Sequence, residues 1–118
     1  MRALDVDLAA LPFDADAMLD GLRPWVERES PTFEPAAVSA MVRLAGERLA
    51  ELGARVEPIP GPAGLGDCLR AAFPHPRVDA PGVLILAHLD TVHPLGTLDR
   101  LPFRRDGEVC YGPGIVDM

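Results

Sequence analysis

A histidine and an aspartate separated by one residue follow an uninterrupted apolar run. His88 and Asp90 come directly after residues 83–87, whose sequence is VLILA. Residues two apart in an extended strand point to the same side, so the imidazole and the carboxylate are expected to be neighbours. A metal-binding histidine usually donates its other ring N–H to a carboxylate or carbonyl, which fixes its tautomer. The pair suits a metal ligand and its orienting partner, while a hydrogen-bonded structural histidine would have the same local pattern.

A second acidic candidate follows a glycine-rich turn. Asp117 comes three residues after Gly112-Pro113-Gly114, where glycine allows the backbone to turn sharply and approach another group closely. Its carboxylate could bind a metal ion, or it could cap a helix that follows. Residue type and position leave both interpretations open.

The other histidines and the cysteines have simpler interpretations. His93 precedes a proline in a loop-like stretch, which favours the rim of a site over a ligand role. His75 lies between two prolines and is expected to be solvated. Cys68 and Cys110 are too few for a disulfide scaffold and are expected to be buried small side chains. They indicate a reducing compartment, and we expect a cytoplasmic protein.

The charge and the start of the chain exclude several classes of partner. The 118 residues carry a formal net charge of −7, so the chain repels phosphates and nucleic acid is not an expected partner. Asp5 and Asp7 interrupt any basic-then-apolar leader pattern. The longest unbroken apolar run, residues 83–87, is far shorter than a membrane span, so no membrane association is expected.

Two helices are expected in the first half of the chain. Asp14 or Asp16 can cap a helix running to about Glu29, and Pro24 is expected to kink or split it. Pro35 suits the first turn of a second helix. The apolar residues of that helix recur at three- and four-residue spacing: Val38, Met41, Val42, Ala45, Leu49 and Leu52. Gly53 follows, where a left-handed helix stop is expected.

Strands dominate the expected second half. Residues 54–59 alternate and residues 68–73 read as a second strand, so the two are expected to pair. The run at 83–87 lacks alternation, which is typical of a strand buried on both faces. Residues 92–105 are expected to be a loop and 108–111 a short strand. This order of elements predicts an α/β fold in which two N-terminal helices pack on a mixed sheet.

The residues around the three candidates resemble the M20 family of metallopeptidases, and within it the glutamate carboxypeptidase group. The resemblance is carried by His88-Leu89-Asp90-Thr91-Val92, Pro94, Gly96-Thr97, Pro102-Phe103, Gly107 and the run from Tyr111 to Met118, with the Glu29-Ser30-Pro31 step between the helices. It spans nearly the whole chain. Arg100-Leu101 and Gly112-Pro113-Gly114 stand where related deacetylases and desuccinylases have Trp and Gly-Arg-Gly.

The resemblance implies a role for each candidate. His88 matches the ligand of one zinc ion, and Asp90 matches the carboxylate that orients that imidazole. Asp117 matches the aspartate that bridges two zinc ions, often before a cis peptide bond, here Asp117–Met118. Two Zn²⁺ ions per complete site would activate a shared water. The implied substrate is a small peptide or an N-acyl amino acid, with glutamate the leading candidate for the amino acid released.

The resemblance also implies that other parts of the family pattern are not in this chain. Residues 1–118 match the N-terminal portion of a zinc-exopeptidase-type catalytic domain. The family's general-base glutamate, its remaining metal ligands and its lid or dimerisation domain all lie downstream of the aspartate matched by Asp117. We therefore expect the chain as given to be inactive, because one histidine and one bridging aspartate cannot fill two four-coordinate sites.

Two other hypotheses remain. The chain could be a truncated, non-catalytic α/β module that binds metal weakly or associates with another protein. It could also be a structural α/β domain whose motif is coincidental. If the chain is a truncated piece, whether of an enzyme or of a non-catalytic module, an apolar strand without all its neighbours favours self-association.

Overall fold

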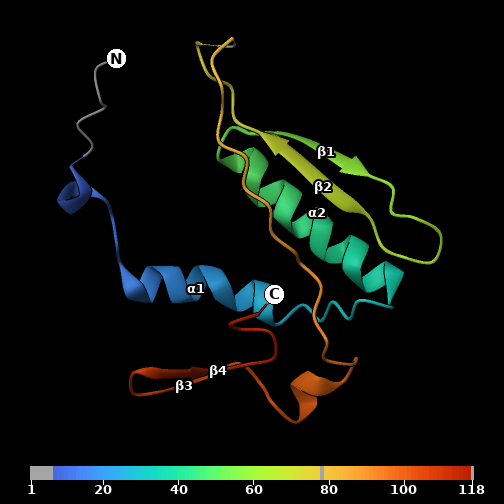
Figure 1. The fold of residues 1–118 in the computed structure, drawn as a ribbon. Helices are drawn as coiled ribbons and strands as arrows, with labels where there is room; N and C mark the ends of the chain where they lie inside the picture. Colours follow the sequence, from blue (N-terminus) through green and yellow to red (C-terminus); the bar gives the residue numbers. More distant parts are fainter. Residues whose placement is uncertain (1–6, 78, 118) are drawn as a thin grey trace.

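Two α-helices and two small antiparallel sheets form the regular structure of the residues that the computed structural model describes, 7–77 and 79–117 (Figure 1). A short 3₁₀ helix at Leu8–Ala10 precedes α1 (Ala15–Val26) and α2 (Pro35–Glu51). The strands are β1 (Arg55–Ile59), β2 (Cys68–Ala72), β3 (Arg104–Asp106) and β4 (Val109–Tyr111), with a second 3₁₀ helix at Thr97–Asp99. The α/β class predicted from the sequence is confirmed.

The first helix begins at the predicted cap and ends earlier than predicted. The side chain of Asp14 accepts a hydrogen bond from the Ala17 amide at 3.0 Å, which satisfies one of the free N–H groups of the first turn. Pro24 lies inside α1, so of the two predicted effects, a kink or a split, the split does not occur. Only two residues of the helix follow Pro24, so few hydrogen bonds remain for the missing N–H to disrupt.

The second helix carries the main apolar core. Pro35 is its first residue, and its buried face holds Val38, Met41, Val42 and Ala45, with Met41 completely inaccessible. Gly53 follows with φ +93°, a left-handed conformation that glycine adopts without steric penalty, as predicted. No helix in the described part of the chain, α2 included, combines the length and apolar character needed to cross a membrane.

The β1–β2 hairpin packs on α2. The two strands pair antiparallel from Arg55 opposite Ala72 to Ile59 opposite Cys68, which confirms the predicted pairing. The side chain of Leu69 lies over Gly46, where an added Cβ would be 3.6 Å away, an ordinary van der Waals contact. This hairpin and α2 form one layered unit (Figure 1).

A second hairpin packs against the end of α1. Strand β4 was predicted, whereas β3 falls in a stretch predicted to be a loop. The reason is a tight turn at Gly107, with φ +60°, which folds the charged residues of β3 back along β4. Phe103, just before β3, is buried together with Val26 at the end of α1. These contacts place the chain after β4 next to the end of the first helix.

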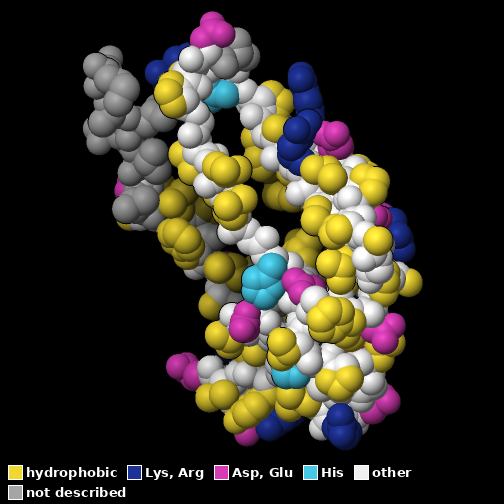
Figure 2. All heavy atoms as spheres, turned by 45° about the vertical axis from the view of Figure 1, so that its right-hand side comes forward, with side chains coloured by type: hydrophobic (Ala, Val, Ile, Leu, Met, Phe, Trp, Pro, Cys, Tyr) yellow, Lys and Arg dark blue, Asp and Glu magenta, His cyan; other side chains and the backbone are white. Residues whose placement is uncertain are grey.

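The apolar run at 83–87 does not form the predicted buried strand, and the predicted mixed sheet is replaced by two separate antiparallel pairs. The side chains from Val83 to Leu86 are 81–92% exposed. A cavity of about 300 Å³ separates Ala87 from Val38 and Leu69, and openings beside the run are visible in Figure 2. A strand needs a neighbour to pair its backbone groups, and no described segment lies alongside this run in hydrogen-bonding register.

The cysteine prediction also needs correction. Cys68 is exposed and Cys110 is half-buried. Cys68 begins β2, and both strands of a two-stranded sheet are edge strands, so burial of Cys68 would require a further layer over it. The radius of gyration, 16.9 Å, exceeds the value of about 13.5 Å typical of a compact chain of this length. The described residues thus form an open arrangement with little core.

We expect the exposed run to drive self-association of the purified chain. Residues 80–89 carry no Asp, Glu, Lys or Arg, so two copies of this acidic chain can approach there without direct repulsion. Sedimentation velocity of the wild type should show dimers or larger species, and Ile85→Glu should shift the distribution towards monomer. Met18→Glu adds the same charge at an exposed apolar residue of α1 and should behave like the wild type. A wild-type monomer at all concentrations would contradict this expectation.

Candidate metal centre

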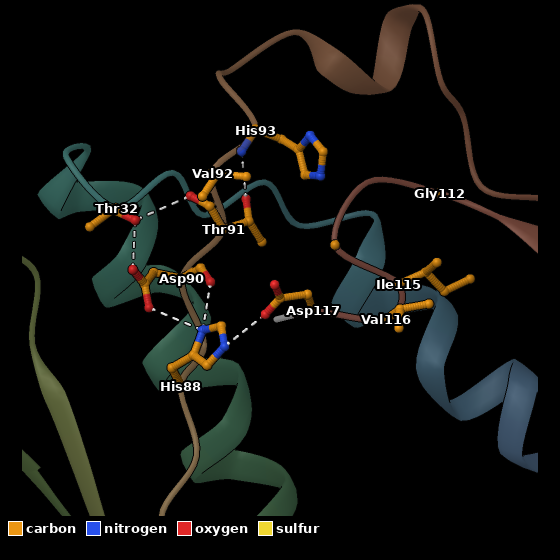
Figure 3. Close-up of a pocket in the computed structure, with 11 residues that line it drawn as sticks. Thr32, His88, Asp90, Thr91, Val92, His93, Gly112, Ile115, Val116 and Asp117 are labelled. Carbon is orange, nitrogen blue, oxygen red and sulfur yellow. Dashed lines mark hydrogen bonds and ion pairs between the residues drawn. The ribbon is translucent and has the colours of Figure 1, made fainter.

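A cleft of about 330 Å³ lies where three distant segments meet (Figure 3). The segments are the linker between α1 and α2, the stretch after the apolar run, and the glycine-rich turn after β4. Its lining consists of Thr32, His88, Asp90, Thr91, Val92, His93, Gly112, Gly114, Ile115, Val116 and Asp117. All three residues predicted as a site from the sequence are among them.

Backbone pairing between the helix linker and the residues after the apolar run positions one wall of the cleft. The Thr91 amide donates to the Ser30 carbonyl at 2.8 Å, and the Thr32 amide donates to the Thr91 carbonyl at 3.1 Å. This forms a parallel bridge between Pro31 and Thr91. The Ser30 hydroxyl, fully buried, donates to the Leu89 carbonyl at 2.8 Å. The end of the run is therefore held by groups 59 residues earlier in the chain.

Close packing positions the opposite wall. An added Cβ on Gly112 would lie 2.6 Å from the Val26 Cγ1 atom, a separation that real side chains do not show. Only glycine allows this approach of the turn to the end of α1. The sequence argument for a close backbone approach at this turn is thus met, and the packing brings Asp117 over the cleft (Figure 3).

The imidazole of His88 lies between two acidic residues. Its Nε2 atom is 3.0 Å from Asp117 Oδ1, although the two residues are 29 apart in the chain. Its Nδ1 atom is 3.0 Å from the backbone carbonyl of Asp90 and 3.4 Å from the Oδ1 atom of the same residue. The imidazole is about half exposed, at 56%, so water reaches the site.

Asp90 contacts the imidazole differently from the sequence prediction. The carboxylate was expected to orient His88, but the nearer acceptor for Nδ1 is the Asp90 backbone carbonyl. The shortest bond of the carboxylate is instead to the Thr32 hydroxyl, 2.6 Å from Oδ2. That hydrogen bond is the main reason the pKa of Asp90 lies below its ordinary value. Sequence reasoning missed Thr32, because only the fold brings it to Asp90.

The protonation of His88 follows from its neighbours. Nδ1 faces the carbonyl and carboxylate of Asp90, and Nε2 faces the carboxylate of Asp117, so both ring nitrogens lie against acceptors. The imidazolium form donates to both sides, whereas neutral imidazole carries one proton and donates to only one of them. Accordingly the pKa of His88 is raised, first by the hydrogen bond to the Asp90 carbonyl and further by Asp117.

The geometry fits two ligands of a zinc ion. Nitrogen and oxygen ligands about 2.0–2.1 Å from a tetrahedral zinc lie about 3.3 Å from each other. The 3.0 Å separation of His88 Nε2 and Asp117 Oδ1 is close to this value. Within residues 7–77 and 79–117, however, no group of three or more His, Cys, Asp or Glu side chains could hold a metal ion. The described residues therefore form no metal-holding cluster, and 3.0 Å is also an ordinary hydrogen-bond distance.

The remaining sequence candidates lie away from the pair or beyond the described residues. His93 is half-buried and lies at the opposite end of the cleft from His88 (Figure 3). His75 is exposed in a loop, where its Nδ1 accepts a hydrogen bond from the Arg77 amide at 3.0 Å. The predicted cis bond to Met118 falls outside the described residues, as does any helix that Asp117 would cap.

Glu29 is a structural residue of the site that sequence reasoning did not single out. Its two carboxylate oxygens accept hydrogen bonds from the Gly96 amide at 2.9 Å and the Leu98 amide at 3.0 Å. These bonds hold the loop that follows His93, and they lower the pKa of Glu29. Its position in the Glu-Ser-Pro step was the available signal, but the partner amides are 67 and 69 residues away.

Comparison with known proteins yields one short similarity. Over 35 residues the chain is 49% identical to carboxypeptidase G2 from Pseudomonas sp. (strain RS-16). That stretch covers 30% of this chain and 8% of carboxypeptidase G2. No family model matches the chain. The chain is thus similar to a carboxypeptidase over about a third of its length.

Replacing Glu29 by glutamine should destabilise the fold, because two backbone amides lose a charged acceptor. We expect Glu29→Gln to lower the free energy of unfolding at neutral pH by ~1–3 kcal/mol, the usual value for hydrogen bonds to a charged group. Glu27→Gln removes an exposed ion pair with Arg23 at 3.7 Å and should change the free energy of unfolding by less than ~1 kcal/mol. Denaturant titrations of the three proteins measure the difference, and equal losses in both variants would contradict this role.

The same carboxylate predicts a pH dependence. The folded pKa of Glu29 lies below its unfolded value, ordinarily about 4.3. Its stabilisation is therefore fully present above the unfolded pKa and is lost as the pH falls through the lowered folded pKa. Glu29→Gln should remove this part of the acid sensitivity, so wild type and variant should converge in stability at low pH. A constant difference between them across that range would show that the carboxylate charge is irrelevant.

Proposed function

We propose that this chain carries part of the two-zinc site of an M20-type metallopeptidase, whose complete form hydrolyses a peptide or amide bond. The observation that carries this function is the facing of His88 Nε2 and Asp117 Oδ1 at 3.0 Å, which brings together two groups of the types that bind zinc. The 35-residue similarity to carboxypeptidase G2 supports the same class of reaction. In this function residues 1–118 are the N-terminal portion of the catalytic domain.

Each site residue has a separate task in this function. His88, through Nε2, and Asp117, through its carboxylate, would hold the zinc. Asp90, through its carbonyl and carboxylate, holds the Nδ1 proton of His88 and so keeps Nε2 available. When bound, zinc lowers the pKa of a coordinated water to about 7 and polarises the carbonyl of the scissile bond.

The residues described here do not include a suitable general base. The Asp90 carboxylate is engaged by the Thr32 hydroxyl, and Asp117 faces His88. The cleft lining among the described residues contains no glutamate. We therefore propose that this chain alone is inactive and that catalysis uses groups it does not supply.

The proposed substrate is a small peptide or an N-acyl amino acid, with glutamate as the leading candidate for the residue released. A cytoplasmic location is part of this hypothesis. It is supported by Cys68 and Cys110, both free thiols, which suit a reducing compartment.

A second candidate function is a non-catalytic module that associates with another chain and binds metal weakly. The specific observation in its favour is the exposed run from Val83 to Leu86, which offers unpaired backbone and apolar side chains. The two-donor cation site is compatible with both functions. Enzymatic activity of a longer form of the protein separates them.

Zinc binding tests the proposed site directly. Isothermal titration calorimetry should detect weak binding to the wild type, strongly reduced in Asp117→Asn and abolished in His88→Ala, because each loses one of two protein ligands. His75→Ala removes an exposed histidine far from the cleft and should bind like the wild type. Negligible binding in the wild type, or equal binding in the wild type and His88→Ala, would refute the metal site.

The raised pKa of His88 predicts that zinc competes with a proton. The imidazolium persists to higher pH than for a free histidine, whose pKa is about 6.5, so zinc affinity should rise with pH through that raised value. Each zinc bound near the midpoint should release about half a proton, approaching one at lower pH. Calorimetry in buffers of different ionisation enthalpy measures this number. Affinity independent of pH in this range would exclude Nε2 as the binding atom.

A further inference from the structure

A groove along α2 separates the apolar run at 83–87 from the β1–β2 hairpin. Its cavity of about 300 Å³ is lined by three parts of the chain. Val38 and Val42, both buried in α2, contribute apolar side chains. Cys68 and Leu69 belong to β2, and the chain from Ala87 onwards continues the run. Figure 1 shows β2 and the run extending along α2 in opposite directions.

Backbone groups without strand partners flank this groove on both sides. Among the described residues β2 pairs with β1 alone, so its other edge is free. No backbone–backbone hydrogen bond in the described part of the chain involves residues 82–88. An extended segment can pair with amides and carbonyls on both sides of a groove, whereas a helix has already paired its own. The groove is therefore suited to an additional β-strand.

The lining also restricts the chemistry of that strand. Its charged side chains, Asp67 and Asp90, are both acidic, so an acidic occupant is repelled. Val38, Val42 and Leu69 favour apolar side chains on the strand that lies over them. A proline within the strand would remove one of the amides that has to pair. The expected occupant is an apolar, proline-free segment without acidic residues.

One exposed segment of the chain itself meets these requirements. Two proline-free stretches of six or more residues in the sequence lack Asp, Glu, Lys and Arg, namely 36–42 and 82–89. The first lies within α2, where its backbone is already hydrogen-bonded. The second lies outside helices and strands, and its side chains from Val83 to Leu86 are 81–92% exposed. Its valine and isoleucine are residues favoured in strands.

We propose that this groove is a strand-docking site for a second copy of the chain, in which the run of each copy lies between β2 and the run of the other. Each run then pairs on one edge with the partner's β2 and on the other with the partner's run. The exchange is reciprocal, so it closes on a dimer instead of propagating into a fibre. This inference gives the second candidate function a partner, and it does not use the candidate metal site.

Crosslinking between two different chains tests the docking. One chain carries Cys110→Ser and so keeps Cys68, which lines the groove, as its thiol. The other carries Cys68→Ser and Cys110→Ser, with either Leu84→Cys or Ile85→Cys to sample both faces of the strand. On mild oxidation of the mixture, at least one of the two run variants should form a disulfide heterodimer. Met18→Cys at an exposed residue of α1 is the matched control and should react several-fold more slowly.

A charge placed in the groove should weaken the dimer without altering the run. Leu65 lines the groove and is 41% exposed, so Leu65→Glu should leave the fold intact and put a carboxylate against the docked strand. We expect the dimer dissociation constant in sedimentation equilibrium to rise ~10-fold or more, because docking would bury an unpaired charge. Leu52→Glu adds the same charge outside the groove lining, at a residue 73% exposed, and should leave the constant unchanged.

Each outcome decides a part of the proposal. A dimer that crosslinks through Cys68 and is weakened by Leu65→Glu alone would support the docking. Crosslinking no faster than in Met18→Cys, or equal dissociation constants in Leu65→Glu and Leu52→Glu, would place the association outside the groove and overturn it. A wild-type monomer at all concentrations would exclude a second copy as the occupant, and fibres would overturn the reciprocal exchange. If Leu65→Glu does not fold, the crosslinking comparison decides alone.

Discussion

The pairing of residues 30–32 with Thr91 is the constraint on which the cleft depends. Two backbone hydrogen bonds, at 2.8 and 3.1 Å, join the linker between the helices to the end of the apolar run. The Ser30 hydroxyl adds a buried bond to the Leu89 carbonyl, so separating the two segments would leave polar groups without partners in a dry environment. The same linker, residues 27–34, supplies Glu29 to the loop after His93 and Thr32 to Asp90.

The end of α1 connects this pairing to the other wall of the cleft. Val26, the last residue of the helix, lies against Gly112, with Phe103 buried beside it. The linker that follows Val26 forms backbone hydrogen bonds with Thr91. One short stretch of chain therefore holds both segments that bring His88 and Asp117 together. As a result, His88 Nε2 and Asp117 Oδ1 face each other at 3.0 Å across the cleft.

Much of the local structure follows from the sequence because local interactions determine it. The cap at Asp14, the start of α2 at Pro35 and its left-handed stop at Gly53 agree with the structure, since each depends on groups within a few residues. The β1–β2 hairpin is also as predicted. The buried strand at 83–87 was wrong for the opposite reason. An apolar run is suited to burial, but it forms a strand only if a neighbouring strand pairs its backbone groups. The described residues provide no such neighbour for residues 83–87.

The sequence by itself determined which side chains could bind a cation, because imidazole and carboxylate are the groups with that chemistry and His88 and Asp90 are neighbours in any extended backbone. Only the tertiary structure decided how they are used. In the fold, the Asp90 carbonyl lies nearer to His88 Nδ1 than the Asp90 carboxylate does. That carboxylate accepts a hydrogen bond from Thr32, and His88 Nε2 faces Asp117. The partners are 58 and 29 residues away, and distances of a few tenths of an ångström choose between acceptors. No local pattern specifies contacts of that range or precision, because they arise from the packing of the whole linker, helix and turn.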